Sequence, residues 1–290
     1  MAYDYFFNLS VKTDPTTTEE YTMRYHALVK EGNKKGADDL RDGWRQQASR
    51  VSIPVPNGEV WEKIAKPQVA LNLLPEGSFF IQFTFTLAKA YLSKDDRSLY
   101  IIDNPIIREK VFNLPFIRPT SWKGSLYSAL WQQGYTREED ARLQRLFGEI
   151  RGEDSGRAGR LFFYPTFFTQ VGLEVINPHD RQRRVGKNPI LLECVPAGAK
   201  GIFSLLYVPF DRIGEDPSET RAQVLADLDC VVQGLEAMFL TYGFSAKRTS
   251  GYGTAKDEIT DLVIATRAQG FSKNQTTFSQ LKQEVENVRF

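Results

Sequence analysis

The order of six regular segments constrains the fold of this chain more than any other feature of its sequence. Residues 78–92 alternate apolar and polar side chains over several residues, which is the pattern of a half-buried strand. Residues 216–243 carry apolar side chains at helical spacing and stop at a glycine, which predicts a long helix. Weaker patterns predict a helix at 121–134 and strands at 160–171, 200–210 and 254–266. The predicted order is strand, helix, strand, strand, helix, strand.

Local signals mark the ends and the buried faces of these segments. Asp216 can cap the second helix, Pro217 suits its first position, and Glu219 would complete a capping box. The apolar stripe of this helix consists of Val224, Leu228, Val231, Leu235, Met238 and Phe239. Within the second strand, Pro165 predicts a bulge or a sheet edge, because proline has no N–H to donate to a neighbouring strand.

This order of elements is the split βαβ, or ferredoxin-like, arrangement that RNA-recognition modules share. We therefore predict an α+β fold with a ferredoxin-like (RRM-like) βαββαβ core, long loop insertions and an extra N-terminal segment. The core is expected in residues 76–268, with an inserted arm near 171–199, and residues 269–290 are expected to form a C-terminal tail.

Residues 1–75 are predicted to form a separate, partly helical N-terminal extension. A strand is expected at Tyr5–Val11, and two charged helices are expected near Glu19–Lys30 and Ala37–Arg50. Neither helix has a strong apolar stripe, so both are expected to pack on another part of the structure. The sequence leaves open whether the extension docks neighbouring subunits or is a fused fragment.

The bulk composition excludes some functions. Lys and Arg number 37 against 36 Asp and Glu, so any nucleic-acid site must come from local clustering of cations. Cys194 and Cys230 lie in apolar segments and are predicted to be buried, reduced thiols. With only two histidines, a zinc site is not expected. We expect a cytoplasmic protein without a membrane partner, because no signal peptide and no membrane-length apolar run is present.

Three spacers between the segments carry cations, and we take as a working hypothesis that they converge around the sheet. They lie at about 90–119, 170–199 and 243–253. The second spacer contains the stretch INPHDRQRRVGKNP at 176–189. Its cationic residues and histidine are His179, Arg181, Arg183, Arg184 and Lys187. By itself such a run is usually a solvated surface, but three converging cationic loops would form a positive groove.

The third spacer is a glycine-rich loop whose backbone can approach a ligand closely. Its relevant residues are Gly243, Lys247, Arg248, Gly251 and Gly253. An RNA phosphate backbone would suit these cations. The loop is not a Walker A motif, because the Lys-Ser/Thr ending and its helix are missing. The alternative interpretation is a helix stop followed by a hairpin entry, with solvated cations.

The first spacer leads into the first helix, for which Thr120 or Ser121 is the expected N-cap. Lys123 would then lie in the first turn, where free N–H groups and the helix dipole favour a phosphate. An ordinary capped helix with an exposed lysine remains the alternative. Asp103 precedes Asn-Pro and can simply form a turn. Aromatic residues near the loops can stack on bases or pack in the core: Phe116, Trp122 and Tyr252.

Three stretches of the chain, spanning about 78–265, resemble the RAMP superfamily of CRISPR type III effector complexes in order and spacing. The family's Asp-x-Pro-Val-Ile-Arg and Pro-Tyr-Ile-Pro-Gly-Ser-Ser-x-Lys-Gly signature is similar to IDNPIIREKVFNLPFIRPTSWKGSLYSAL. Its glycine-rich loop resembles GFSAKRTSGYG, and its inserted arm resembles INPHDRQRRVGKNPILLECVPAGAKGIFSLLYVP. The resemblance is closest to the repeating backbone subunit that binds guide RNA and cuts target RNA.

The resemblance implies a site. Asp103 matches the family's catalytic aspartate and would hold a divalent metal, expected to be Mg²⁺. Ser121, Lys123 and Gly124 would seat guide-RNA phosphates. The family's glycine in Ile-Pro-Gly-Ser-Ser is lost here, so binding is expected to depend more on the Arg118 side chain. The full set of predicted RNA-binding residues is Arg108, Arg118, Ser121, Lys123, Gly124, His179, Arg181, Arg183, Arg184, Lys247, Arg248, Gly251 and Gly253.

Three functions are compatible with this sequence. The first is a catalytic backbone subunit with guide RNA, target RNA and other CRISPR effector subunits as partners. The second is a capping subunit with the same fold that binds RNA without cutting it. The third, ranked last, is a guide-processing ribonuclease, which would need a histidine base. His26 is the only candidate for that base and lies outside the matched region.

Overall fold

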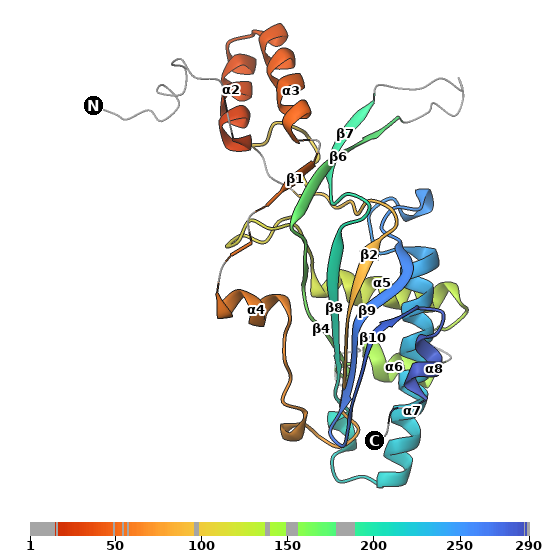
Figure 1. The fold of residues 1–290 in the computed structure, drawn as a ribbon. Coiled ribbons are helices and arrows are strands. Elements are labelled where there is room, and N and C mark those ends of the chain that lie inside the picture. The colour runs from red at the N-terminus through yellow and green to blue at the C-terminus, as the bar shows by residue number, and fades with distance from the viewer. Residues whose placement is uncertain are drawn as a thin grey trace. The chain divides into compact units, whose positions relative to one another are not determined.

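The computed structural model describes residues 15, 17–48, 50–53, 55–56, 58–95, 99–136, 140–148, 156–177, 189–286 and 288. The chain divides into two compact units, each made of segments that are distant in the sequence (Figure 1). The hairpin unit consists of residues 1–54, 92–115 and 169–196, and the core unit consists of residues 55–91, 116–168 and 197–290.

The core unit contains a five-stranded sheet with the order β10-β9-β2-β8-β4. Its strands are β2 (Phe79–Leu87), β4 (Leu161–Phe163), β8 (Lys200–Tyr207), β9 (Ala255–Thr266) and β10 (Gly270–Thr276). All neighbouring pairs are antiparallel. Without β10, the order of the four remaining strands is the one that a ferredoxin-like core requires, so the predicted fold class is confirmed.

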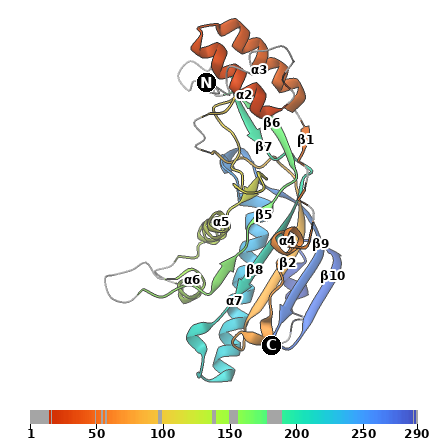
Figure 2. The same ribbon diagram turned by 90° about the vertical axis from the view of Figure 1, so that its left-hand side faces the viewer.

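Helices cover one face of this sheet, as Figures 1 and 2 show for α5 (Pro119–Gln132), α6 (Ala141–Phe147), α7 (Pro217–Ala237) and α8 (Leu281–Val285). A π-helical turn (Met238–Tyr242) continues α7 to Gly243, where the backbone turns with φ of 72°. Alternate residues of β2 form the core beneath the helices and are fully buried: Phe79, Ile81, Phe83, Phe85 and Leu87. On the other face, the Gln82 side chain donates to the carbonyl of Pro67, which follows helix α4 (Glu59–Ala65).

The predicted N-cap of α7 is confirmed and that of α5 is not. The Glu219 side chain accepts from Arg212 and Gln223, and the predicted capping box of α7 is only half formed. The Asp216 carboxylate accepts the N–H of Glu219 at 2.8 Å, Pro217 is the first helical residue, and the predicted apolar stripe is buried. Helix α5 begins earlier than expected, with Arg118 as its N-cap. The N-cap prediction at Thr120 or Ser121 is therefore wrong. The reason is Pro119, whose fixed φ and missing N–H suit the first helical position.

Proline also divides the predicted strand at 160–171. Strand β4 ends before Pro165, and the chain resumes as β5 (Thr166–Phe167), which pairs with β3 (Phe116–Ile117) in a small separate ladder. Strand β4 lies at the edge of the five-stranded sheet, as Pro165 predicted. At the other edge, the expected tail contributes β10 and α8. Three short 3₁₀ turns complete the unit, at Leu71–Leu73, Phe210–Arg212 and Arg248–Ser250.

The hairpin unit combines two helices with a three-stranded sheet of order β1-β6-β7. Helices α2 (Thr18–Lys30) and α3 (Lys34–Ala48) match the two predicted helices, and a Thr17–Glu20 capping box begins α2. The sheet consists of β1 (Arg50–Ser52), β6 (Gln170–Ile176) and β7 (Ile190–Cys194). The inserted arm is thus carried by a β-hairpin. The predicted strand at Tyr5–Val11 lies outside the described residues.

Candidate nucleic-acid interface and cleavage site

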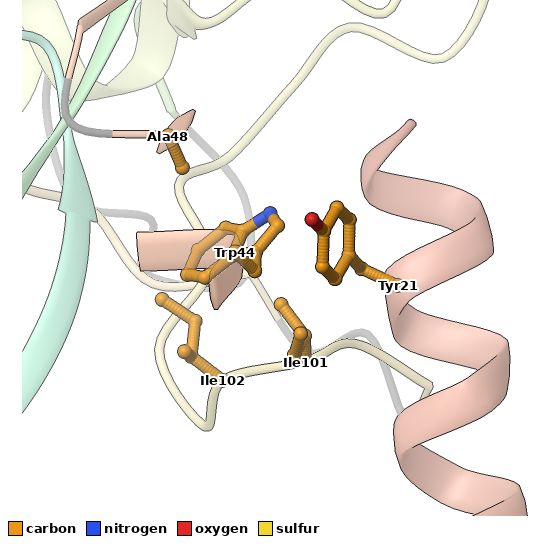
Figure 3. Packing of buried hydrophobic residues seen from close by; sticks show 5 residues of the cluster. All are labelled: Tyr21, Trp44, Ala48, Ile101 and Ile102. Atoms are coloured by element: carbon orange, nitrogen blue, oxygen red, sulfur yellow. The ribbon is translucent and has the colours of Figure 1, made fainter. Parts of the chain in front are cut away.

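The segment that carries Asp103 is attached to the helical hairpin by a small hydrophobic cluster. Ile101 and Ile102, the residues immediately before Asp103, are buried against the Trp44 side chain of α3 (Figure 3). Tyr21 from α2 and Ala48 from α3 complete the cluster. The N-terminal extension and the first spacer therefore form one hydrophobic core, which fixes the position of the Asp103 backbone.

The buried carboxylate of Glu193 holds the residues that flank Asp103 in place. Glu193 is 2 % exposed, and its carboxylate accepts three hydrogen bonds from this region. Its oxygens accept from the Tyr100 hydroxyl at 2.7 Å, the Ile106 N–H at 3.0 Å and the Arg108 guanidinium at 2.7 Å. In addition, the Glu193 N–H donates to the carbonyl of Asn104. The Asp103 turn is therefore held on both sides.

Arg108, one of the predicted RNA-binding residues, is part of this internal network. Its side chain is 11 % exposed and donates to Glu193 and to the carbonyl of Asn113. Burial alone would lower the pKa of Arg108, but the charge of Glu193 and its hydrogen bond outweigh burial, so the pKa is raised. Arg108 is therefore permanently charged and paired within the protein.

Asp103 itself is exposed at the rim of a cavity of about 270 Å³. Within the described residues, no hydrogen bond or ion pair involves its carboxylate. The cavity is also lined by Arg41 and Arg45 from α3, Tyr25 from α2, and Val175, Pro189, Ile190 and Leu191 from the arm-bearing hairpin. The first spacer and the base of the arm therefore meet here, as the convergence hypothesis requires for these two loops.

The donor set around Asp103 limits how a metal could be held. In the part of the chain that the structure describes, no group of three or more His, Cys, Asp or Glu side chains could hold a metal ion. Mg²⁺ commonly keeps several waters and binds through one or two carboxylates together with substrate phosphates. Asp103 fits that kind of site, with RNA supplying the remaining oxygen ligands.

His26 lies in the same unit and is bound to the backbone. One of its ring nitrogens, Nε2, is 3.0 Å from the carbonyl oxygen of Tyr100. A carbonyl can only accept, so Nε2 is the protonated nitrogen of this ring. The contact links α2 to the residue three positions before Asp103, which is a structural role.

In the core unit, the start of α5 presents the predicted phosphate-binding residues to solvent. Arg118, Ser121 and Gly124 are exposed, and Lys123 is half-buried. A Cβ at Gly124 would meet no atom within 4 Å, so the helix surface there is open to a ligand backbone. The Arg118 guanidinium lies 6.0 Å from the ring centre of Phe116, which is half-buried and stacks on Phe167. This surface combines a helix start, cations and an aromatic ring.

The two ends of the glycine-rich loop pack closely together at Gly243 and Gly253, and the cations between these glycines are exposed. A Cβ at Gly243 would lie 2.7 Å from the carbonyl oxygen of Tyr252, and one at Gly253 would lie 2.3 Å from Cβ of Ser245. Neither position can accept a side chain without a shift of the backbone. Lys247 and Arg248 are exposed at the tip, while Gly251, with φ of 79°, has open space around it.

A side-chain contact joins this loop to α5. The Arg248 guanidinium donates to the hydroxyl of Ser128 at 3.1 Å. The third spacer and the helix that follows the first spacer therefore share one surface of the core unit. The cations and the histidine of the stretch at 176–189 lie outside the described residues: His179, Arg181, Arg183, Arg184 and Lys187.

One of the three aromatic residues near the loops, Trp122, is not accessible to bases. Trp122 is fully buried, and its indole N–H donates to the hydroxyl of Thr166 at 3.1 Å, so packing in the core is the alternative that holds for Trp122. The helical spacing places it on the inner face of α5 against Phe203 and Phe244. Tyr252 and Phe116 are half-buried and retain exposed surface.

Sequence reasoning missed several residues of the Asp103 region. Arg41 and Arg45 lie in a charged helix outside the three stretches whose motifs resemble the family, so no motif pointed to them. Glu193 had a signal, since it is the one charged residue in the apolar run ILLECV. A buried charge needs a partner, and Arg108 is that partner. Both cysteines are free and buried as predicted, and burial raises the pKa of each thiol to about 12.

The fold and these surfaces define a class: ferredoxin-like proteins that carry an inserted arm and a cationic glycine-rich loop. The model of the RAMP superfamily matches residues 34–256. The chain belongs to the RAMP superfamily. The endoribonuclease Csm3 of a CRISPR system in Mycobacterium tuberculosis (strain ATCC 25618 / H37Rv) is 27 % identical over 179 residues, which are 53 % of this chain and 74 % of that protein.

Solved structures agree with the fold. A chain of the type III-B Cmr-beta complex bound to cognate target RNA has a TM-score of 0.55 with 14 % identity, over 92 % of this chain and 84 % of that chain. At this identity the match supports the fold alone. No helix in the described part of the chain combines the length and apolar character that a membrane crossing requires.

Proposed function

We propose that this chain is a guide-RNA-binding subunit of a type III CRISPR interference complex and that it cleaves target RNA paired with the guide. Membership of the RAMP superfamily supports the RNA-binding role. The relative named as an endoribonuclease of a CRISPR system supports both the cleavage activity and the kind of assembly. The expected partners are guide RNA, target RNA and other subunits of the complex.

The observation that carries the cleavage proposal is the state of Asp103. Its neighbours on both sides are anchored by the Trp44 cluster and by Glu193, while its carboxylate faces a cavity. A turn-forming aspartate normally hydrogen-bonds the backbone one or two residues later. Within the described residues Asp103 makes no such bond, so its carboxylate is available to a ligand.

The chemistry is an attack of the ribose 2′-OH on the adjacent phosphate. The O2′–P bond forms, the P–O5′ bond breaks, and the products carry a 2′,3′-cyclic phosphate and a 5′-OH. Asp103 would hold a divalent ion, Mg²⁺, which supplies charge stabilisation at the phosphate. The protein's own contribution is to hold the target strand so that O2′, phosphorus and O5′ are in line.

The test uses the assembled complex with a guide and a matched target RNA. Asp103→Ala should abolish cutting while assembly and target binding remain, and chelation of divalent ions should have the same effect. Asp39→Asn is the matched control, because Asp39 is an exposed carboxylate on α3 that does not line the cavity. Products should end in a cyclic phosphate.

Two results would contradict the proposal. A wild-type complex that binds matched target in Mg²⁺ but never cuts it would assign the chain to the non-catalytic capping role. An Asp103→Ala protein that no longer assembles would assign Asp103 to loop formation.

A further inference from the structure

The cavity beside Asp103 has a basic wall that comes from the N-terminal extension. Arg41 and Arg45 both line it, together with Asp103. They lie four residues apart on α3, and residues at this spacing share one helix face. Both arginines therefore line the same cavity as Asp103.

Both arginines have partners that a phosphate can replace. Arg41 pairs with Asp38 at 2.7 Å and Arg45 pairs with Asp42 at 3.1 Å, each three residues away on the same helix. Both carboxylates are more than half exposed. Exposed ion pairs of this kind contribute about 0–1 kcal/mol, so they hold the side chains only weakly. Arginine can bind both carboxylate and phosphate oxygens in a bidentate manner. A phosphate can therefore take the place of the carboxylate with the same geometry.

Packing and a hydrogen bond hold the helix that carries Arg41 and Arg45 in place. Trp44, next to Arg45 in the sequence, packs on Ile101 and Ile102, next to Asp103. Its indole N–H donates to the Thr18 hydroxyl of α2 at 3.3 Å. The Arg41 guanidinium also lies 5.9 Å from the ring centre of Tyr25. The same hydrophobic cluster therefore positions the carboxylate and the basic helix face relative to each other.

The charged and apolar residues that line the cavity suit a phosphate that becomes more negative during the reaction. One carboxylate and two guanidinium groups leave the cavity lining with net positive charge. Ile101, Ile102 and Leu191 supply apolar surface around them, which reduces solvent screening. When O2′ attacks, the pentavalent phosphorus carries more negative charge than the bound phosphodiester. Fixed cations at that position stabilise the transition state more than the ground state.

We propose that Arg41 and Arg45 bind the scissile phosphate of the target RNA at Asp103, so that the N-terminal extension is part of the cleavage site. The inference rests on the proposed cleavage function. In the step itself the O2′–P bond forms and the P–O5′ bond breaks. The 2′-OH proton leaves to solvent or to Asp103, and water returns a proton to O5′.

The experiment measures single-turnover cleavage of a matched target by the assembled complex, together with target affinity. Arg41→Gln and Arg45→Gln keep the length and polarity of the side chains and remove the charge. Each should slow cleavage by about 10- to 100-fold with little change in target affinity. Added guanidinium ion should partly restore the rate, and Arg→Lys at either position should be less impaired than Arg→Gln.

Lys34→Gln is the matched control, since it removes an exposed cation from the same helix outside the cavity and should leave the rate unchanged. Three outcomes overturn the inference. The first is cleavage at the wild-type rate by both Arg→Gln variants while Asp103→Ala is inactive, which leaves the proposed function standing. The second is a loss of target affinity as large as the loss of rate. The third is a wild-type complex that does not cut, in which case the proposed function fails as well.

Discussion

Glu193 and Arg108 form an ion pair with a 2.7 Å contact, and their side chains are 3 % and 11 % exposed. Glu193 lies on β7 and Arg108 lies 85 residues earlier in the first spacer. Because Glu193 also binds Tyr100 and the Ile106 N–H, this pair determines the path of the chain through Asp103.

The first prediction concerns that pair. Glu193→Leu should destabilise the protein by about 3–5 kcal/mol, because it leaves the Arg108 charge buried without a partner. Arginine stays protonated in proteins, so the side chain cannot escape this cost by losing its proton. Combining Glu193→Leu with Arg108→Met should recover much of the loss. Denaturant unfolding of the four proteins of this cycle gives the coupling.

The matched control is Asp38→Ala, which breaks the exposed pair with Arg41 and should change stability by about 1 kcal/mol or less. If Glu193→Leu costs no more than this control, the pair does not stabilise the Asp103 segment as described.

The second prediction concerns the cations of the core unit. Lys123→Ala, Lys247→Ala and Arg248→Ala should each weaken guide-RNA binding, and to a similar extent for unrelated guide sequences. Each change should also make the salt dependence of binding shallower, by up to about one unit of slope per lost phosphate contact. Titrations at several salt concentrations with two guide sequences measure both effects.

Lys282→Ala serves as the control for these variants, since Lys282 is an exposed cation of α8 that pairs with Asp229. Its salt slope should equal that of the wild type. A loss of affinity for one guide sequence alone would mean that these cations do not form a phosphate-binding groove.

The third prediction concerns the inserted arm. Deleting residues 178–187 should leave the fold intact, because Ile176 and Ile190 are already paired neighbours at the end of the β6–β7 hairpin. We expect the deletion to impair target cleavage more than guide loading, since the arm is proposed to contact the guide–target duplex. Thermal unfolding, guide retention and target cleavage are measured on the same preparation. Unfolding of the protein, or cleavage at the wild-type rate, would contradict an arm role.

Much of the core unit could be predicted from the sequence because its signals are local. The pattern of β2 and the Asp216–Pro217 start of α7 depend on residues that are neighbours in the chain, and the structure confirms the strand and the helix start. The expected half-burial of β2 is wrong, because Phe80 and Gln82 on its other face are buried as well. The order of the elements then leaves few possible sheets, and the ferredoxin-like strand order is one of them. The N-cap prediction for α5 was wrong because Thr120 and Ser121 are common N-cap residues, while the preceding Pro119 favours the first helical position.

The strand β10 and the helix α8 were missed for a related reason. The sequence of β10, GFSKNQT, is largely exposed and has few apolar residues, so its strand conformation comes from pairing with β9. Edge strands with one partner show little periodicity, because only part of one face is buried.

By itself, the sequence determined the fold class, the positions of the cationic loops and the candidacy of Asp103, because each depends on residue order and local chemistry. Only the tertiary structure decided which distant groups share a space. It paired Arg108 with Glu193, buried Trp122, and brought Arg41 and Arg45 to the cavity that Asp103 lines. These relationships follow from long-range packing of the Trp44 cluster and from the need of a buried charge for a partner. Neither leaves a periodic pattern in the chain.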